Sequence, residues 1–294
     1  MSSLPLTNTR PRIAIAGATG RIGSVLTGGL SAEAVDVVAL GRSPDAAKFP
    51  AGVTVASIDF DDPTSLERAL QGANRLFVAH GTSARQVFNE IALIDAAVAA
   101  GVDHIVKVSV LGPPSRLHPF DWHMTAEAHL ASQSVGYTVL RPSPFVDILN
   151  RAAAQVTAGS WSGAAGHGRA NFIDTRDVAD VARVALLDSS AVSFQRAFHL
   201  TGPRAWSMQE IAAELSLLLG RRVTYGERSP EEQRSALVDA GTSEFVAELL
   251  LGLDQVFRES ALAETTTTVQ ELTGHPPRTL PQWLQENLAL FSAD

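Results

Sequence analysis

Three glycines near the N-terminus have the spacing of a dinucleotide-binding turn. They lie in the run Gly17-Ala18-Thr19-Gly20-Arg21-Ile22-Gly23. We expect Gly17 to permit a tight turn, Gly20 to let backbone amides approach a pyrophosphate, and Gly23 to let a helix pack closely on a strand. Unpaired N–H groups at the start of that helix would favour phosphates. The predicted cofactor-binding residues in this turn are Gly17, Thr19, Gly20, Arg21, Ile22 and Gly23.

The neighbouring sequence supplies the elements that such a turn needs. An apolar β-branched run at residues 12–16 predicts a buried parallel strand before the glycines. Ile22, Val25, Leu26 and Leu30 follow at helical spacing. A glycine run is credible as a dinucleotide fingerprint only at such a strand–turn–helix corner.

Arg42 follows the second predicted strand, residues 35–40. Folds that prefer NAD place an acidic residue here for the ribose 2′-hydroxyl. A guanidinium suits a 2′-phosphate instead, and Arg21 could assist it. The sequence therefore predicts NADP(H), with a solvated surface arginine as the alternative interpretation.

Two later strands end in polar residues. His80 and Gly81 follow the fourth predicted strand, residues 76–79, and strand ends of this kind border the ligand crevice of an open α/β sheet. We predict that both contact the cofactor, with an ordinary loop histidine as an equally weighted alternative for His80.

Lys107 lies inside the apolar fifth strand, residues 104–110, where it shares a face with Ser109. A lysine there needs either a partner or access to the crevice, so a structural ion pair and snorkelling stay open beside a role in the site.

The glycine spacing resembles the short-chain dehydrogenase/reductase superfamily, and a later segment narrows the resemblance. Ordinary members carry Tyr-x-x-x-Lys on a helix, with a glutamate four residues on. Here Pro119 and His123 take the places of that pair, while Glu127 keeps the glutamate. The segment leads to Tyr-Thr-x-Leu-Arg-Pro at residues 137–142. This combination resembles the NmrA-like atypical family, and the similarity continues through residues 161–168, 171–179 and 200–202.

The resemblance implies a doubly wound parallel sheet (Rossmann fold) with a smaller, mostly helical C-terminal substrate lobe. We expect a dinucleotide-binding domain at residues 1–150, to which residues 170–202 return, and a substrate lobe at residues 151–169 and 203–294. Strand–helix alternation up to Arg141 supports the same α/β class independently.

The resemblance also assigns roles to individual residues. It implies that Asp59 with Phe60 meets the adenine, that Pro142 and Phe145 form the nicotinamide wall, and that Ser109 takes the catalytic Ser/Thr position. Because the usual tyrosine is missing, the predicted catalytic residues are His123, Lys107 and Ser109. Imidazole titrates near neutrality, so His123 is the candidate general acid, with a structural helix-start residue as the alternative. The predicted substrate contacts are Trp122, Phe145 and Trp161.

The family's bacterial enzymes include NAD(P)H:quinone oxidoreductases and triphenylmethane-dye reductases, whereas other members are cofactor-sensing regulators. We therefore expect an NADPH-dependent oxidoreductase that transfers hydride to a planar or conjugated acceptor such as a quinone, dye, imine or enone. The alternatives are a non-catalytic NADP-binding regulator that acts through a protein partner and an isomerase or lyase on the same fold.

Composition excludes several other classes. The chain has 294 residues, a formal charge of −8 and no cysteine, so disulfides and thiolate chemistry are absent and nucleic acid is not an expected partner. No N-terminal signal segment or membrane-spanning run is apparent. We expect a cytoplasmic protein with a small-molecule substrate, no metal site, no membrane partner and possible homo-oligomers. The leucines at 249–251 and 253 are expected to be core rather than ligand-binding.

Overall fold

The computed structural model describes residues 10–43, 49–112, 120–159, 161–190 and 194–292. The chain forms two compact units. Unit 1 contains Met1–Val108, Ala126–Val139 and Ala182–Ala197, and unit 2 contains Ser109–Thr125, Leu140–Val181 and Phe198–Asp294.

A seven-stranded sheet of Rossmann type organises the fold, in the order β3-β2-β1-β4-β5-β6-β9. Each pairing among its first five strands is parallel, with Ile15 opposite both Ala39 and Phe77. The predicted doubly wound α/β fold is therefore confirmed. The strands of this sheet are β1 (Arg12–Ala16), β2 (Asp36–Gly41), β3 (Thr54–Ser57), β4 (Arg75–Val78), β5 (His104–Val108), β6 (Gly136–Pro142) and β9 (Gln195–Leu200).

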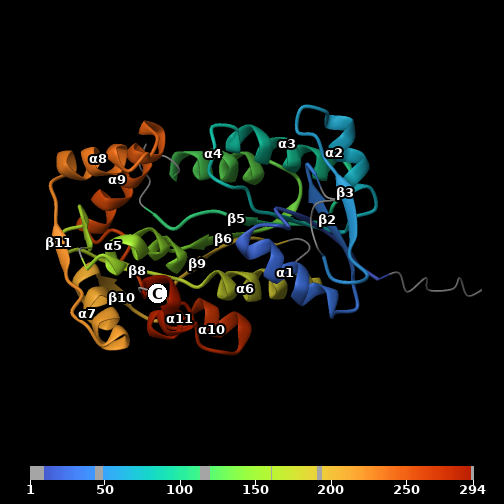
Figure 1. The fold of residues 1–294 in the computed structure, drawn as a ribbon. Helices are drawn as coiled ribbons and strands as arrows, with labels where there is room; N and C mark the ends of the chain where they lie inside the picture. Colours follow the sequence, from blue (N-terminus) through green and yellow to red (C-terminus); the bar gives the residue numbers. More distant parts are fainter. Residues whose placement is uncertain (1–9, 44–48, 113–119, 160, 191–193, 293–294) are drawn as a thin grey trace, which may run out of the picture. The chain divides into compact units, whose positions relative to one another are not determined.

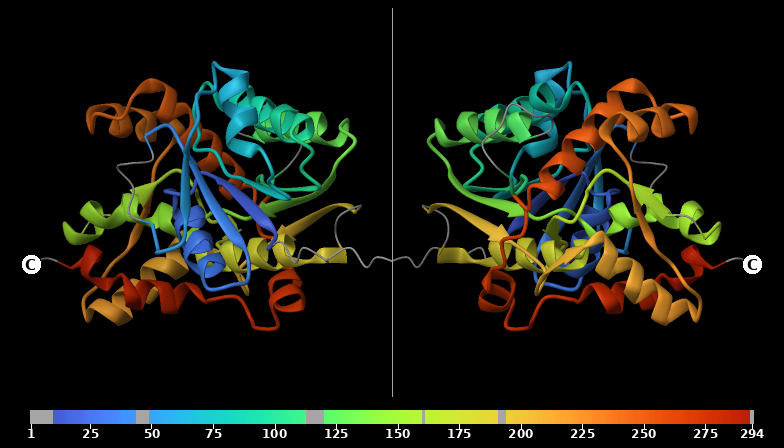
Figure 2. Two further views of the ribbon diagram at one scale, coloured as in Figure 1. Left: turned by 90° about the vertical axis from the view of Figure 1, so that its right-hand side faces the viewer. Right: turned by 90° about the vertical axis from the view of Figure 1, so that its left-hand side faces the viewer.

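Helices cover both faces of the sheet in unit 1. Helix α1 (Arg21–Ser31) lies on one face, whereas α2 (Pro63–Leu70) and α3 (Gln86–Ala99) lie on the other (Figures 1 and 2). Strands β1, β2, β4 and β5 are almost entirely buried because both faces are covered, whereas the edge strand β3 is largely exposed. Further helices of the chain are α4 (Phe120–Ala131) and α6 (Thr175–Leu187).

Unit 2 adds two small sheets and a set of helices. Strands β7 (Trp161–Gly163) and β11 (Tyr225–Glu227) pair in parallel, and β8 (Arg169–Asn171) pairs antiparallel with β10 (Ala205–Ser207). The helical elements of unit 2 are η2 (Val146–Ala152), α5 (Ala153–Thr157), α7 (Met208–Leu219), α8 (Pro230–Asp239), α9 (Glu244–Arg258), α10 (Thr268–Thr273), α11 (Leu280–Glu286) and η4 (Leu288–Phe291).

Packing explains where the two units divide. Leu111, Phe120, Val146 and Leu149 lie in the hydrophobic core of unit 2, although the sequence assigned residues 1–150 to one cofactor domain. Core packing defines the compact units, whereas ligand contacts define a functional domain. The division into a cofactor domain and a substrate lobe therefore stays a prediction.

Local capping signals mostly gave correct helix boundaries. Asp62 caps α2, and Ser207 and Ser229 form capping boxes at α7 and α8. The sequence also predicts Ser83 as the N-cap of a helix that runs to Ala100. This prediction is wrong, because α3 begins at Gln86 and only the backbone carbonyl of Ser83 accepts a bond from the Gln86 amide. His118 and Pro119 lie outside the described residues. Among the residues with described positions, no helix is long and apolar enough to cross a membrane.

Candidate functional site

The glycine run folds into the predicted corner between β1 and α1. Gly17 has φ +85°, a conformation that a residue with a side chain adopts only with strain. A Cβ on Gly17 would overlap the backbone oxygen of Ala79, and a Cβ on Gly23 would overlap the carbonyl of Gly17. Both glycines are therefore required by close backbone packing.

Gly20 differs from its two neighbours. It is the N-cap of α1, with φ −76°, and no side chain caps the first turn of this helix. A Cβ at Gly20 would meet only the carbonyl oxygen of Gly17, at 3.1 Å. The exposed helix start thus offers amide donors and positive dipole to an approaching anion, as a bound pyrophosphate requires. The corner fits a dinucleotide.

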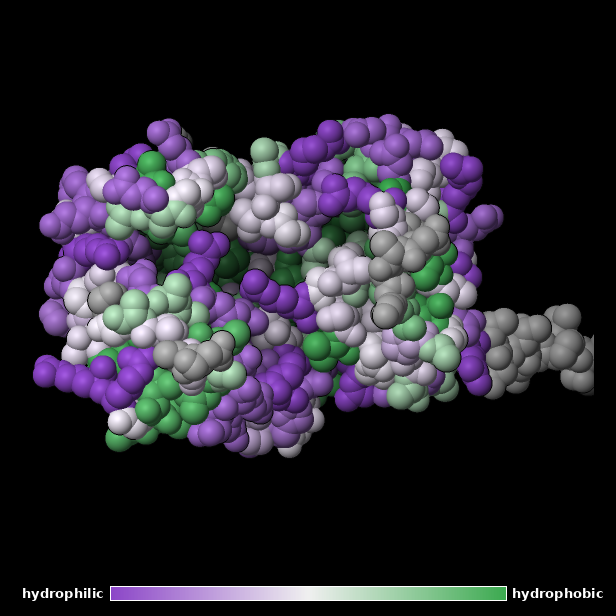
Figure 3. All heavy atoms as spheres, viewed as in Figure 1, coloured by the Kyte–Doolittle hydropathy of each residue, from purple (hydrophilic) through white to green (hydrophobic). Residues whose placement is uncertain are grey.

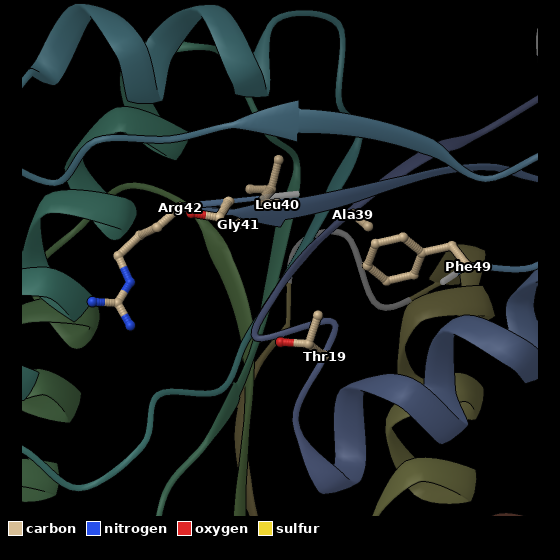
Figure 4. Close-up of a pocket in the computed structure, with 7 residues that line it drawn as sticks. Thr19, Ala39, Leu40, Gly41, Arg42 and Phe49 are labelled. Carbon is tan, nitrogen blue, oxygen red and sulfur yellow. The ribbon is translucent and has the colours of Figure 1, made fainter. Parts of the chain in front are cut away.

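A cavity of about 340 Å³ lies beside this corner in unit 1. Thr19 comes from the glycine turn, and Gly41, Arg42 and Ser43 come from the end of β2 (Figure 4). The ring of Phe49 lines the same cavity and was not among the predicted site residues. No local signal marks Phe49, since its segment reaches the cavity only through the tertiary fold.

His80 holds the turn after β4 through both ring nitrogens. Its Nδ1 donates to the carbonyl oxygen of Gly81 at 2.6 Å, and its Nε2 then accepts from the amide of Asn89 at 2.8 Å. The ring also meets Phe60 edge-on, with centroids 5.9 Å apart. Because both nitrogens are engaged within unit 1, the predicted contact of His80 with the cofactor would use ring carbons or the backbone.

Asp59 and Phe60 follow β3 at the position predicted to meet the adenine. Asp59 is exposed, and its Oδ1 accepts the backbone N–H of Asp61 at 3.0 Å. Its backbone N–H donates to Ser65 Oγ at 3.1 Å. These bonds fix the turn and leave the second carboxylate oxygen, Oδ2, available to a ligand.

Lys107 forms an ion pair in the interior of unit 1. Its Nζ lies 2.8 Å from Oε2 of Glu90, and both side chains have zero exposure. The same ammonium donates to the carbonyl of Val108 at 2.9 Å. This is the structural ion pair that the sequence left open. A catalytic or cofactor-binding role for Lys107 stays a prediction.

The other predicted catalytic and cofactor residues lie in unit 2. His123 is half-buried on α4, and Ser109 is buried one residue beyond β5. Phe145 precedes η2, and a parallel bridge pairs it with Ile173, while Pro142 closes β6. The ring of Trp122 stacks on Phe245 of α9 at 6.1 Å and 17°. Their roles in catalysis or binding stay predictions.

Unit 2 contains a second cavity, of about 350 Å³, that Trp161 lines. The Trp161 ring packs edge-on against Tyr225, with centroids 5.0 Å apart. Leu250 and Leu253 of α9 line this cavity too. Leu253 also packs against the core of unit 2, whereas Leu250 is only half-buried. The expectation that the leucines at 249–251 and 253 are core rather than ligand-binding stays a prediction, and α9 turns part of its apolar face toward a cavity.

Gly163 and Ala165 line this cavity, and hydrogen bonds hold the backbone of the segment 163–166 that carries them, called the wall below. The hydroxyl of Tyr225 accepts the N–H of Ala165 at 3.1 Å. The carbonyl oxygen of Ala164 accepts a hydrogen bond from Arg258 Nη2 at 2.8 Å. The backbone N–H of Ala164 donates to the carboxylate of Asp254. Burial raises the pKa of Asp254 to about 6, against the lowering effect of the Ala164 bond, and burial raises the pKa of Tyr225 to about 12. Both groups hold the wall in place.

The parallel sheet and the glycine corner at the carboxyl end of its first strand define a Rossmann-type dinucleotide-binding protein. The model of the NAD(P)H-binding family matches residues 17–189, which is more than half of the chain. The chain belongs to this family.

Curated relatives cover nearly the whole chain. Quinone oxidoreductase 2 of Escherichia coli (strain K12) is 34% identical over 280 residues, covering 92% of this chain and 96% of that protein. The NAD(P)H azoreductase of Xenophilus azovorans is 32% identical over 288 residues, covering 96% and 99%.

Solved structures agree with these relatives. The NADPH complex of the Escherichia coli NADPH-dependent quinone oxidoreductase superposes with a TM-score of 0.87 at 30% identity, covering 94% of this chain and 99% of that one. The triphenylmethane reductase of Citrobacter sp. with NADP(H) gives a TM-score of 0.83 at 24% identity, covering 93% and 99%. At 24% identity, the match to the triphenylmethane reductase shows a shared fold and nothing further.

Proposed function

We propose that the protein is a cytoplasmic NADPH-dependent oxidoreductase that transfers hydride to a planar, conjugated acceptor of the quinone or dye type. The observation that carries the proposal is the cavity beside the glycine corner, which Thr19 and Arg42 line together. A helix start for the pyrophosphate and a guanidinium for the 2′-phosphate are the two features that NADPH requires. The named activities of the full-length relatives support the choice of acceptor.

The chain's own residues bind and orient the cofactor in this proposal. The first turn of α1 receives the pyrophosphate, and Arg42 makes charge-assisted bonds to the 2′-phosphate. Asp59 with Phe60, together with the turn at His80 and Gly81, faces the adenosine half. Pro142 and Phe145 form the wall behind the nicotinamide. When bound, NADPH supplies the hydride from its nicotinamide C4.

Hydride transfer to such an acceptor needs little acid–base catalysis. Quinones and cationic dyes accept hydride readily, so the missing Tyr/Lys pair is tolerable. His123 is the proposed proton donor for the reduced acceptor, and Ser109 and Lys107 are the other proposed polar groups near the reacting centre. Aromatic residues at positions 122, 145 and 161 are proposed to cover the acceptor, so that positioning supplies most of the rate.

The test is oxidation of NADPH, followed at 340 nm by steady-state kinetics, against a panel of quinones, dyes, imines and enones. We expect turnover with at least one quinone or dye and a preference for NADPH over NADH. Tight NADPH binding with no oxidation in the presence of any acceptor would contradict the oxidoreductase and favour a cofactor-sensing regulator.

A further inference from the structure

The cavity of unit 2 has the size of a small acceptor site. Its volume of about 350 Å³ lies at the lower end of the range of about 300–1,000 Å³ that small-molecule sites span. One or two fused rings fit a site of this size. Apolar atoms are visible in the hollow below α8 and α9, at the left of Figure 3.

Much of the apolar lining comes from four separate elements. Ile148 and Leu149 belong to η2, Trp161 to β7, Leu237 to α8, and Leu250, Leu253 and Phe257 to α9. Flat aromatic surface therefore meets aliphatic side chains across the cavity, an arrangement that suits a conjugated ring. The wall at residues 163–166 is fixed by its backbone bonds to Tyr225 and Arg258, so the cavity is largely pre-formed.

The residues that line the cavity include more positively charged groups than negatively charged ones. Arg151 and Arg228 carry two positive charges, and Asp254 carries the single carboxylate. That carboxylate is already engaged by the backbone of Ala164 and faces Arg258 on its own helix. Arg228 is held in place by a bond from Nη1 to Gln233 Oε1 at 3.1 Å. The site is thus biased against a cation and toward an oxygen that gains negative charge.

We infer that this cavity, which Trp161 alone of the three proposed aromatic contacts lines and which begins at η2 directly after Phe145, is the acceptor pocket, and that it selects neutral one- or two-ring quinones over triphenylmethane dye cations. The inference rests on the proposed oxidoreductase function and names its substrate class. Hydride transfer breaks the C–H bond at nicotinamide C4 and gives the quinone two electrons. One quinone oxygen then carries negative charge until it takes a proton, so the products are hydroquinone and NADP⁺. Arg228 stabilises that developing charge, whereas reduction of a dye cation creates no anion for it to stabilise.

A cavity-filling substitution tests the location. Ala236 of α8 lines the cavity, whereas Val238 of the same helix is exposed and does not. We expect Ala236→Trp to lower kcat/KM for 2-methyl-1,4-naphthoquinone about tenfold or more, with the Kd for NADPH unchanged. Val238→Trp is the matched control and should leave both quantities unchanged. Unchanged kinetics in a folded Ala236→Trp enzyme would place the acceptor elsewhere and overturn the inference.

A charge reversal tests the selectivity without filling the core. The readout is the ratio of kcat/KM for the naphthoquinone to that for malachite green, a triphenylmethane cation. We expect a ratio above about tenfold in the wild type and a shift of about tenfold toward the dye in Arg228→Glu. Arg222→Glu, at an exposed residue outside the cavity, should not move the ratio.

The two proposals fail in different ways. A ratio that is unchanged in Arg228→Glu, or a wild type that prefers the dye, overturns the selectivity while the oxidoreductase stands. A wild type that binds NADPH and reduces neither acceptor contradicts the proposed function itself, and with it the inference.

Discussion

The ammonium of Lys107 lies 2.8 Å from the carboxylate of Glu90, and neither side chain reaches solvent. Glu90 also accepts a long bond from Gln86, one turn earlier on α3, at 3.4 Å. A buried pair of this kind joins β5 to α3 within unit 1. Removing one partner leaves the other as an uncompensated charge, which is far more costly than removing both.

Lys107→Met should therefore destabilise the protein by about 3–5 kcal/mol, because it strands the carboxylate of Glu90. Lys107→Met/Glu90→Met should recover most of that loss, as an apolar pair of similar volume. Thermal and urea unfolding measure both effects. If the double variant also recovers kcat/KM, Lys107 has a structural role only, and the proposed catalytic role is contradicted.

Gly20→Ala should weaken NADPH binding more than it weakens the fold. The loss of the glycine N-cap costs roughly 1 kcal/mol, whereas a methyl group at the helix start blocks the approach of the pyrophosphate. Gly28→Ala, with nothing within 4 Å of its Cβ, offsets the stability loss by up to about 1 kcal/mol. The double variant should thus unfold like the wild type and still bind NADPH poorly by fluorescence titration. Wild-type affinity in that variant would contradict the assigned phosphate site.

Arg42→Ala should reduce affinity for NADPH and leave affinity for NADH almost unchanged. One charge-assisted hydrogen bond contributes roughly 1.5–3 kcal/mol, which is about 10- to 100-fold in Kd. Arg68→Ala, at an exposed arginine of α2, is the control and should change neither affinity. Retained NADPH affinity in Arg42→Ala, or a wild type that prefers NADH, would show that Arg42 is a surface residue.

His123→Ala should lower kcat with little change in KM, if His123 donates the proton. The matched control on α4 is His129→Ala, which removes a 2.6 Å pair with Asp95 and a 3.4 Å contact with Gln133. Steady-state kinetics on a confirmed quinone provide the comparison. A kcat/KM within about threefold of the wild type, under roughly 0.7 kcal/mol of transition-state stabilisation, would mean that water supplies the proton.

Asp254→Asn should change how stability depends on pH. Burial raises the pKa of Asp254 to about 6 in the folded protein. The folded state therefore keeps this proton where the unfolded chain has lost it, and unfolding free energy falls as pH rises from about 4 to about 6. Asparagine still accepts a hydrogen bond from the Ala164 N–H, but it does not titrate, so the unfolding free energy of the variant does not fall in this way.

The Asn variant should match the wild type near about pH 4 and exceed its melting temperature above about pH 6. The charged neighbour of Asp254 on α9 is Arg258, and Arg151 on η2 and Arg228 directly after β11 line the same cavity. Asp239→Asn, at the exposed end of α8, is the control. Parallel melting curves for wild type and Asp254→Asn across this range would contradict the raised pKa.

The sequence by itself determined the features that depend on local signals. Strand–turn–helix alternation and the glycine run predicted the Rossmann sheet and the corner at Gly17 and Gly23. Capping residues such as Ser207 gave helix starts because they satisfy backbone donors within three residues. The N-cap predicted at Ser83 is wrong because the backbone carbonyl of Ser83, and not its hydroxyl, accepts the hydrogen bond from the first amide of α3.

Only the tertiary structure decided which distant residues meet. A lysine inside an apolar strand indicates that it needs a partner, but that partner, Glu90, lies seventeen positions earlier and in another element, α3. Phe49 reaches its cavity, and Leu250 and Trp161 line another together, through packing of segments far apart in the chain. Periodicity reports which side of an element is apolar, and it does not report whether that side meets a filled core or an open cavity. That distinction depends on the shapes of all the surrounding elements at once.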